Sequence, residues 1–339
     1  MNAIVLSKHG KPDVLKVTSV PDPHPASGEV RVKVHTIGLN YAETLSRRGL
    51  YGWAPKLPYV PGMEAYGEID ELGQNVTHRH VGERVIVGTQ YGSYAERIVV
   101  QETQVLPAVE AFSSEENAAF AVNYLTAWIS LFKMALVRES DTVLIHAAAG
   151  GVGTAAVQLS KNYGCKVYGT ASSERKLELL SSLNVDGAFN YVKGDFEEEL
   201  KQHTGNGGVD VVLETVGGEV FRKSVKVLRP FGRIVVAGFA SFDLKKWNPV
   251  SWIRTWKDLP RASISNMARN SYGVMAFHLG YLFPNRRLLI RTWDELMAFV
   301  SKHEIRPVVG HTFQFEDMWK AHRLMESRQS MGKIVVHIS

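Results

Sequence analysis

The sequence of 339 residues predicts an α/β protein that combines a doubly wound parallel sheet with a smaller antiparallel β module. Short segments in the first third of the chain alternate apolar and polar residues, as strands with one solvated face do. Further along, apolar strands alternate with amphipathic helices, which is the pattern of a parallel sheet covered on both faces. A glycine-rich turn joins one of these strands to its helix. The length suits about two domains of ordinary size.

The antiparallel module is predicted from segments of period two. Val30, Val32 and Val34 alternate with charged or polar residues, and prolines at 21, 23 and 25 exclude a helix immediately before them. Further strands are expected at 67–70, 81–87 and 94–100, where glycine-bearing turns separate short apolar segments.

The pattern changes after residue 112. Ser113 and Glu116 have the spacing of a capping box, which predicts a helix start before the apolar run 118–136. Strands are then expected at 143–146, 166–170, 209–213 and 233–237, and helices at 152–163, 174–182 and 219–228. Right-handed crossovers between such strands give a doubly wound sheet. An amphipathic helix at 293–302 and a strand at 333–336 are expected to return the chain to the β module.

Composition and charge exclude several classes of protein. The net charge is small, 39 − 34 = +5, and basic residues occur only in isolated pairs, so nucleic-acid binding is not expected. The single cysteine, Cys165, excludes an internal disulfide and predicts a buried thiol in a reducing, cytoplasmic compartment. No signal pattern and no apolar run of about 18 residues occurs, so no transmembrane segment is predicted.

The sharpest motif is the turn at 147–153, Ala-Ala-Ala-Gly-Gly-Val-Gly, between a strand and a helix. Gly150 and Gly153 match the later glycines of the dinucleotide pattern G-x-G-x-x-G, and Ala148 replaces the first. Small residues allow a pyrophosphate to approach the N–H groups at the start of the helix. The motif predicts a dinucleotide site; the alternative is a tight turn without a ligand.

The residues after the second strand of this domain distinguish the two nicotinamide cofactors. NAD-binding proteins carry an acidic residue there, which binds the ribose hydroxyl. This chain has Ser172, and Lys176 lies one helical turn further on, so both can bind a 2′-phosphate and NADPH is predicted. Glu174 favours NADH unless it only complements the helix dipole, and the alternative for Arg175 and Lys176 is a solvated helix face.

Metal and nucleophile motifs are not predicted. His78 and His80 form the only close histidine pair, in a polar stretch typical of a surface loop. Zinc in a catalytic site needs three protein ligands, so no zinc site is predicted. The sequence also has no G-x-S-x-G nucleophile elbow.

Several short motifs occur together along the chain. They are Gly-Leu-Asn-Tyr at 38–41, Arg-Gly-Leu-Tyr at 48–51, Pro-Gly-Met-Glu at 61–64, Asn-Tyr-Leu-Thr-Ala at 123–127, the loop 147–153, Asn-Tyr at 190–191 and Phe-His-Leu-Gly-Tyr-Leu at 277–282. With them the whole chain resembles the zinc-independent quinone oxidoreductases of the medium-chain dehydrogenase/reductase superfamily, close to the zeta-crystallin-like and vesicle-amine-transport-protein-like branches.

The resemblance implies a domain arrangement. A GroES-like antiparallel β domain, residues 1–120 and 266–339, would enclose an inserted Rossmann domain, residues 121–265. NADPH would bind in the cleft between them. The resemblance also implies a homodimer formed through the edges of the Rossmann sheets.

The resemblance further assigns roles to individual residues. Asn40, Tyr51 and Thr126 are expected to line the nicotinamide pocket, Gly150, Gly151, Val152 and Gly153 to meet the pyrophosphate, Ser172, Lys176 and Tyr191 to bind the 2′-phosphate end, and Phe239, His278 and Leu279 to lie near the nicotinamide. Tyr51, as hydrogen-bond donor, and Asn40 are the catalytic candidates. The alternatives are a turn role for Asn40, a surface aromatic at Tyr51, core packing for Tyr191 and a packed His278.

One departure from the wider superfamily bears on metal content. Zinc-dependent relatives have Gly-His-Glu where this chain has Gly62, Met63 and Glu64, and a thioether is a poor substitute for imidazole on zinc. The resemblance therefore implies a zinc-independent NADPH-dependent reductase that transfers hydride to quinones or other α,β-unsaturated carbonyls. The alternatives are an enoyl or alkenal double-bond reductase and a non-enzymatic NADPH-binding protein.

Overall fold

The computed structural model describes residues 1–238, 260–283 and 285–338. The chain forms two compact units. Unit 1 comprises Met1–Asn123, Leu279–Phe299 and Arg306–Ser339, and unit 2 comprises Tyr124–His278 and Val300–Ile305. Phe239 and the first part of the stretch 242–270, both singled out in the sequence, lie outside the described residues.

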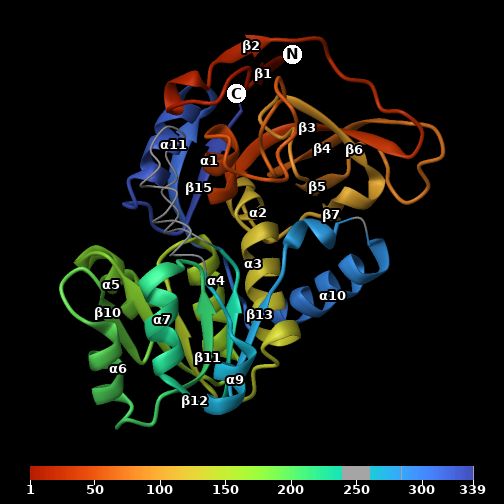
Figure 1. Ribbon diagram of the computed structural model, residues 1–339. Coiled ribbons are helices and arrows are strands. Elements are labelled where there is room, and N and C mark those ends of the chain that lie inside the picture. Colours follow the sequence, from red (N-terminus) through yellow and green to blue (C-terminus); the bar gives the residue numbers. More distant parts are fainter. Residues whose placement is uncertain (239–259, 284, 339) are drawn as a thin grey trace. The chain divides into compact units, whose positions relative to one another are not determined.

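Unit 1 contains a seven-stranded sheet built around its longest strand, β3 (Figure 1). Its strands are β3 (Glu29–Leu39), β4 (Glu64–Leu72), β5 (Arg84–Gly88), β6 (Arg97–Gln101), β7 (Val105–Pro107), β14 (Val309–Gln314) and β15 (Lys333–His337). Strand β3 pairs with β15, β4 and β6, all antiparallel. The pair β14–β15 is parallel, so the module is not wholly antiparallel as predicted. Because Gly82 has a φ of 86° and belongs to a turn, β5 begins later than the expected residue 81.

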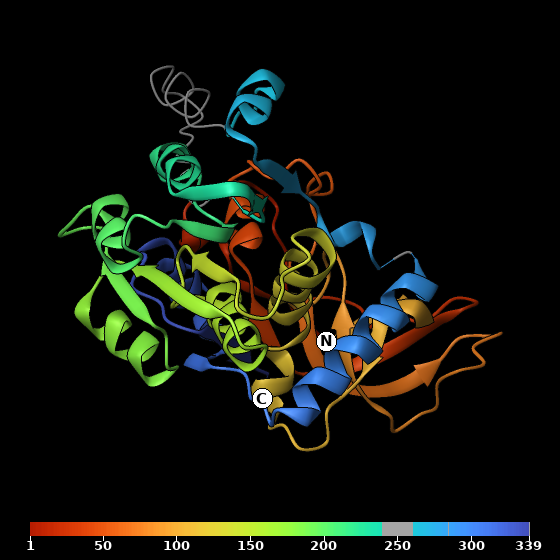
Figure 2. The ribbon, with the colours of Figure 1, turned by 90° about the horizontal axis from the view of Figure 1, so that it is seen from below.

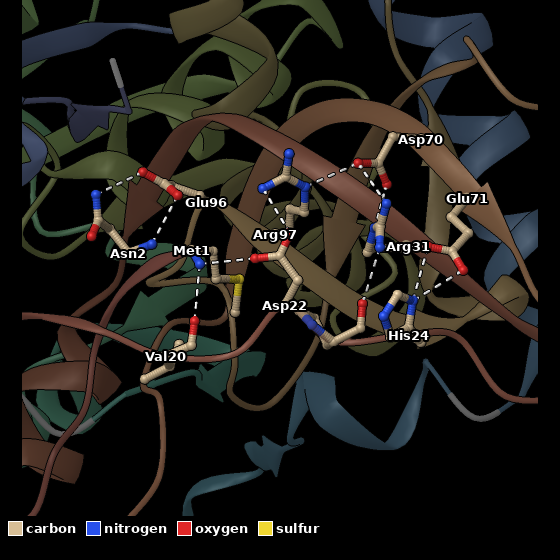
Figure 3. A network of polar contacts seen from close by, with 11 residues as sticks. Met1, Asn2, Val20, Asp22, His24, Arg31, Asp70, Glu71, Glu96 and Arg97 are labelled. Atoms are coloured by element: carbon tan, nitrogen blue, oxygen red, sulfur yellow. Dashed lines mark hydrogen bonds and ion pairs between the residues drawn. The ribbon is translucent and has the colours of Figure 1, made fainter.

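A polar network attaches the start of the chain to this sheet (Figure 3). Strand β1 (Asn2–Ile4) pairs with β2 (Val17–Ser19), and the 3₁₀ turn η1 (Pro12–Val14) lies between them. The α-amino group of Met1 lies 2.8 Å from Asp22 Oδ1, and Arg97 contacts both Asp22 and Asp70 at 3.2 Å. Arg31 Nε donates to Asp70 Oδ1 at 2.7 Å. These ion pairs join the N-terminal segment to β3, β4 and β6.

Short helices complete unit 1. They are α1 (Tyr41–Arg47), η2 (Glu102–Gln104), α2 (Ser114–Ala118), η4 (Leu279–Tyr281), α10 (Arg286–Lys302), η5 (Phe315–Asp317) and α11 (Met318–Glu326). The predicted capping box is confirmed, because Ser113 N donates to Glu116 Oε2 at 2.8 Å and Glu116 N to Ser113 Oγ at 3.2 Å. Helix α10 starts earlier than the predicted residue 293, and α11 was not predicted.

Unit 2 contains a six-stranded parallel sheet in the order β10-β9-β8-β11-β12-β13. The strands are β8 (Thr142–Ile145), β9 (Lys166–Ala171), β10 (Gly187–Asn190), β11 (Val209–Glu214), β12 (Leu228–Val236) and β13 (Gly273–Ala276). The helices are α3 (Ala121–Trp128), which starts in unit 1, the π-helical turn η3 (Ile129–Met134), α4 (Gly151–Asn162), α5 (Glu174–Ser182), α6 (Phe196–His203), α7 (Gly218–Lys226) and α9 (Ile264–Asn270). Figure 2 shows helices on both sides of the parallel strands, so the predicted α/β class is confirmed.

The direction of winding changes at β8. The chain runs from β8 outward through β9 to β10, and then crosses to β11 on the other side of β8. In doubly wound sheets this reversal opens a crevice at the carboxyl ends of the strands, where ligands bind. Strand β10 and helix α6 were not predicted. Among the described residues, no helix has both the length and the apolar character needed to cross a membrane.

Candidate functional site

The carboxyl ends of β8 and β9 bring together the loop 147–150 and the residues after Ala171. Ala148 N donates to Thr170 O at 3.0 Å, which joins the loop to β9. Ala147 adopts a left-handed conformation with φ 48°, uncommon for a residue with a side chain. The chain thereby turns sharply from β8 into α4, whose first N–H groups have no partners within the helix.

The glycines of this loop serve different purposes. A Cβ on Gly153 would lie 2.4 Å from Ala147 O and 2.6 Å from the Ala148 backbone, so Gly153 is required for the close approach of helix and turn. A Cβ on Gly150 would meet only Ala147 O, at 3.3 Å. Packing therefore does not account for Gly150. The start of α4 is consistent with a site at which the backbone faces an anion.

Ser172 and Lys176 lie together at the end of β9. Lys176 Nζ donates to Ser172 Oγ at 3.4 Å, and burial lowers the pKa of Lys176. Glu174 points elsewhere: its Oε1 accepts from Lys193 Nζ at 2.8 Å and from Asn190 Nδ2 at 3.2 Å. The hydroxyl and ammonium predicted for a 2′-phosphate are thus adjacent, while the carboxylate that argued for NADH is engaged with β10.

The other predicted residues of unit 2 are less closely connected. Tyr191 follows β10, donates its N–H to Ala171 O at 3.2 Å, and is 40% exposed, which contradicts the core-packing alternative. Thr126 is buried on α3, and burial lowers the pKa of the half-buried His278. Leu279 begins η4 in unit 1. The roles of these residues remain predictions.

Two buried polar groups that the sequence did not indicate support the same edge of the sheet. His146 bonds Thr170 Oγ1 at 3.0 Å and Ser224 Oγ at 2.8 Å, and burial lowers its pKa to about 3, so the ring is neutral. Glu214 ends β11 and accepts from Val216 N at 2.6 Å and Gly217 N at 2.9 Å. Burial raises the pKa of Glu214 to about 7.

Asn40 lies at the start of α1 in unit 1 and is 9% exposed. Its Oδ1 accepts from Lys333 Nζ at 2.7 Å, while its Nδ2 donates to Gly38 O at 3.2 Å and to Glu43 Oε1 at 3.4 Å. Lys333 Nζ also donates to Glu64 Oε2 at 2.6 Å. The predicted site residue is therefore part of a buried, charged cluster.

Glu43 is the hub of a second chain of hydrogen bonds. Its carboxylate accepts from Asn40 N at 2.9 Å, Met63 N at 2.8 Å and Tyr94 Oη at 2.5 Å. Because Tyr94 donates to Glu43, it accepts from His322 Nε2 at 2.9 Å, which leaves His322 Nδ1 to accept from Arg47 Nε. Desolvation, with the Arg47 charge adding, lowers the pKa of His322 to about 3.

Tyr51, the second catalytic candidate, lies in the loop after α1. Burial, and secondarily the Glu43 charge, raises the pKa of Tyr51 to about 12, so its hydroxyl stays protonated and can donate a hydrogen bond. The Trp53 ring lies 5.5 Å from the Tyr51 ring between centroids and is 46% exposed. Tyr51 is thus half-buried rather than a free surface aromatic, and Trp53 forms an aromatic pair with it.

Sequence reasoning missed most of this cluster. The spacing of Asn40 and Glu43 is that of a capping box, which could have indicated their contact. Lys333, Tyr94 and His322 carry no local signal, since each sits among apolar or ordinary polar neighbours.

The donor set in the described residues does not resemble a zinc site. No group of three or more His, Cys, Asp or Glu side chains that could hold a metal occurs there. Met63 is bonded through its N–H to Glu43, and His78 and His80 are exposed in a loop. Cys165 is buried as predicted, and burial raises the pKa of its thiol to about 12.

Comparison with known families identifies both units. A family model described as alcohol dehydrogenase GroES-like domain matches residues 26–110, and one described as zinc-binding dehydrogenase matches residues 151–272. Together they cover more than half of the chain. The family descriptions apply to the families as wholes.

Individual relatives match almost end to end. The chain is 34% identical to the rat synaptic vesicle membrane protein VAT-1 homolog, over 99% of this chain and 84% of that protein. It is 31% identical to rat quinone oxidoreductase, over 99% and 97%. The crystal structure of Escherichia coli quinone oxidoreductase complexed with NADPH is similar with a TM-score of 0.88 at 28% identity, over 99% of this chain and 100% of that one.

Proposed function

The chain belongs to the quinone oxidoreductase and VAT-1-like branch of the medium-chain dehydrogenase/reductase superfamily, and from this premise we propose an NADPH-dependent, zinc-independent reductase of quinones or other α,β-unsaturated carbonyls. The observation that carries the proposal is the adjacency of Ser172 and Lys176 beside the loop 147–150. It provides for both phosphate-bearing ends of NADPH on one edge of a sheet.

Residues of unit 2 would hold the cofactor. The N–H groups at the start of α4, from Gly151 to Gly153, would bind the pyrophosphate. Ser172 would donate to the 2′-phosphate and Lys176 would neutralise it, with the exposed Tyr191 alongside. The neutral His146 and the carboxylate of Glu214 keep the supporting loops in place through their backbone and hydroxyl partners.

Residues of unit 1 would act on the acceptor. NADPH, when bound, supplies a hydride from C4 of its nicotinamide ring. The protonated Tyr51 hydroxyl would donate a hydrogen bond to the carbonyl oxygen of the acceptor, which gains negative charge. Asn40 would line the nicotinamide pocket with an amide held by Lys333 and Glu43. Solvent can protonate the resulting enolate or hydroquinone anion.

Zinc independence is proposed from the chemistry of the available donors. The thioether of Met63 is a weak ligand for zinc, which prefers thiolate, imidazole and carboxylate. The carboxylate of Glu64 is paired with the Lys333 ammonium, and that of Glu43 accepts backbone and tyrosine donors. A zinc ion would have to displace these partners.

The proposal is tested by following NADPH oxidation at 340 nm with a panel of quinones, enals and enones, before and after dialysis against a chelator. Turnover of quinones that survives the chelator supports the proposal. Turnover of enals or enones alone would identify the double-bond reductase, and NADPH binding without turnover of any acceptor would identify the non-enzymatic alternative. Loss of turnover that added zinc restores would refute metal independence.

We also propose a homodimer in the cytoplasm, with unit 2 contributing the interface. Strand β13 pairs with β12 on one side, and no second strand pairs with it within residues 1–238, 260–283 and 285–338. Ile264, on the neighbouring α9, is 84% exposed. Sedimentation velocity with the full chain tests this proposal, and a monomer at micromolar concentration would refute it. The domain limits at 120/121 and 265/266 remain predictions.

A further inference from the structure

Lys333 is the first residue of β15 and is one of the most deeply buried charges in unit 1 (Figure 1). Its side chain is 2% exposed. Removing an ammonium from water costs several kcal/mol, so a buried lysine requires good partners. Its Nζ has two: Glu64 Oε2 at 2.6 Å and Asn40 Oδ1 at 2.7 Å.

The surrounding backbone is fitted to this lysine. A Cβ on Gly38 would lie 2.9 Å from Lys333 Cε and 3.0 Å from Glu64 Oε2, so the glycine leaves room for the ion pair. The other oxygen of Glu64 accepts from Val122 N at 2.8 Å. The pair with Glu64 is therefore complete in itself, and charge neutralisation alone does not explain the second bond, to Asn40.

That second bond determines which way the Asn40 amide faces. An ammonium can only donate, so Asn40 must present Oδ1 to Lys333, and a carboxylate can only accept, so it must present Nδ2 to Glu43. Both charges select the same orientation. The ammonium also draws electron density from the amide oxygen, which strengthens the Nδ2–H groups as donors.

We infer that Lys333 is a positioning residue that orients the Asn40 amide so that its Nδ2–H faces the nicotinamide carboxamide. This role rests on the proposed function, which assigns Asn40 to the nicotinamide pocket. Lys333 acts through Asn40 and needs no contact with the cofactor itself. The competing explanation is that Lys333 only neutralises the buried Glu64.

The single variant Lys333→Met cannot separate the two explanations, because it leaves Glu64 buried and unpaired. The double variant Glu64→Gln/Lys333→Met removes both charges together, and the introduced glutamine keeps an acceptor for Val122 N. A buried ion pair replaced as a unit by neutral groups is often neutral or stabilising. The double variant should therefore melt near the wild-type temperature while losing the donor to Asn40 Oδ1.

The matched control is the double variant Arg79→Met/Glu83→Gln. It removes another ion pair of unit 1, with an NH1–Oε1 distance of 2.6 Å and both side chains 15% exposed. Affinities for NADPH and for adenosine 2′,5′-bisphosphate, which lacks the nicotinamide, are measured by titration calorimetry. In the Glu64/Lys333 variant NADPH affinity should fall about tenfold, the value of one hydrogen bond, and the bisphosphate should bind within about twofold of wild type. The control variant should bind both as wild type does.

The result that would overturn the inference is equal NADPH affinity in wild type and the Glu64/Lys333 variant, or an equal loss for both ligands. Cofactor affinity does not depend on turnover. If the wild-type protein reduces no acceptor, the proposed reductase activity fails, and the selective loss of NADPH affinity still decides the role of Lys333.

Discussion

Replacement of Lys176 by methionine should weaken NADPH binding and leave NADH binding nearly unchanged. Lys176 is half-buried on α5, and its Nζ donates to Ser172 Oγ at 3.4 Å. Burial lowers the pKa of Lys176 because partial removal from water disfavours the ammonium. A 2′-phosphate at this position compensates for that lost hydration, whereas the ribose hydroxyl of NADH does so only weakly. Methionine keeps the length of the side chain and removes its charge.

The size of the effect follows from this environment. A hydrogen bond to a charged group contributes about 1.5–3 kcal/mol, which corresponds to about 10- to 100-fold in affinity. Partial burial favours the upper part of this range, because solvent screens the contact less. Glu174 does not offset the loss, since it is bonded to Lys193 at 2.8 Å and Asn190 at 3.2 Å.

The assay is a fluorescence titration of wild type, Lys176→Met and Arg175→Met with both cofactors. Arg175 is the matched control, because it is a neighbouring cation that is exposed. Its loss should change NADPH affinity by less than about fivefold, as for exposed charge pairs. An equal loss of NADPH and NADH affinity in Lys176→Met would refute the reasoning. So would a larger NADPH loss in Arg175→Met, which would move the phosphate contact to the exposed face of α5.

Three further predictions concern the loop and the buried polar groups. Gly151 begins α4 without a left-handed φ, so Gly151→Val should fold but lose the NADPH-induced rise in melting temperature; a full rise would contradict the phosphate-binding role of the loop. Tyr94→Phe removes the donor to Glu43 and the acceptor for His322, which should lower the free energy of unfolding by about 3–5 kcal/mol in urea, whereas Tyr66→Phe, whose hydroxyl makes no hydrogen bond to the described residues, should stay within about 0.5 kcal/mol; similar losses in both would argue against the network. Burial lowers the pKa of His322 to about 3, so folding keeps this ring neutral, and the stability it contributes is present above its unfolded pKa and lost as pH falls below about 6.5. By pH 5 this amounts to about 2 kcal/mol, and a His322→Gln profile as steep as that of wild type would exclude this role.

The regular elements of unit 2 were predictable because their signals are local. The predicted helix 174–182 has the observed bounds of α5, and the strand and helix flanking the loop 147–153 differ from β8 and α4 by about a residue at each end. In each case a run of apolar residues meets a turn or cap signal within a few positions. That is the information a sequence holds along its own length.

Local signals failed where elements are short and polar. Strand β10 has only four residues, and α6 is rich in glutamate, with Phe196 and Leu200 as its fully buried apolar side chains. Packing against β9 and the neighbouring helix α7 stabilises them, and that packing leaves almost no periodicity to detect. The parallel pairing of β14 with β15 likewise depends on the path of the chain through α11.

The sequence by itself determined the fold class, the glycine loop and the candidates for the 2′-phosphate, since the relevant residues lie within about one strand–turn–helix unit. It also singled out Asn40 as a candidate. Only the tertiary structure decided which partners hold its amide, because Lys333 is 293 positions away and reaches Asn40 through the antiparallel pairing of β15 with β3. A buried charge becomes favourable only where folding supplies its counter-charge and acceptors, and those come from segments whose proximity no local pattern records.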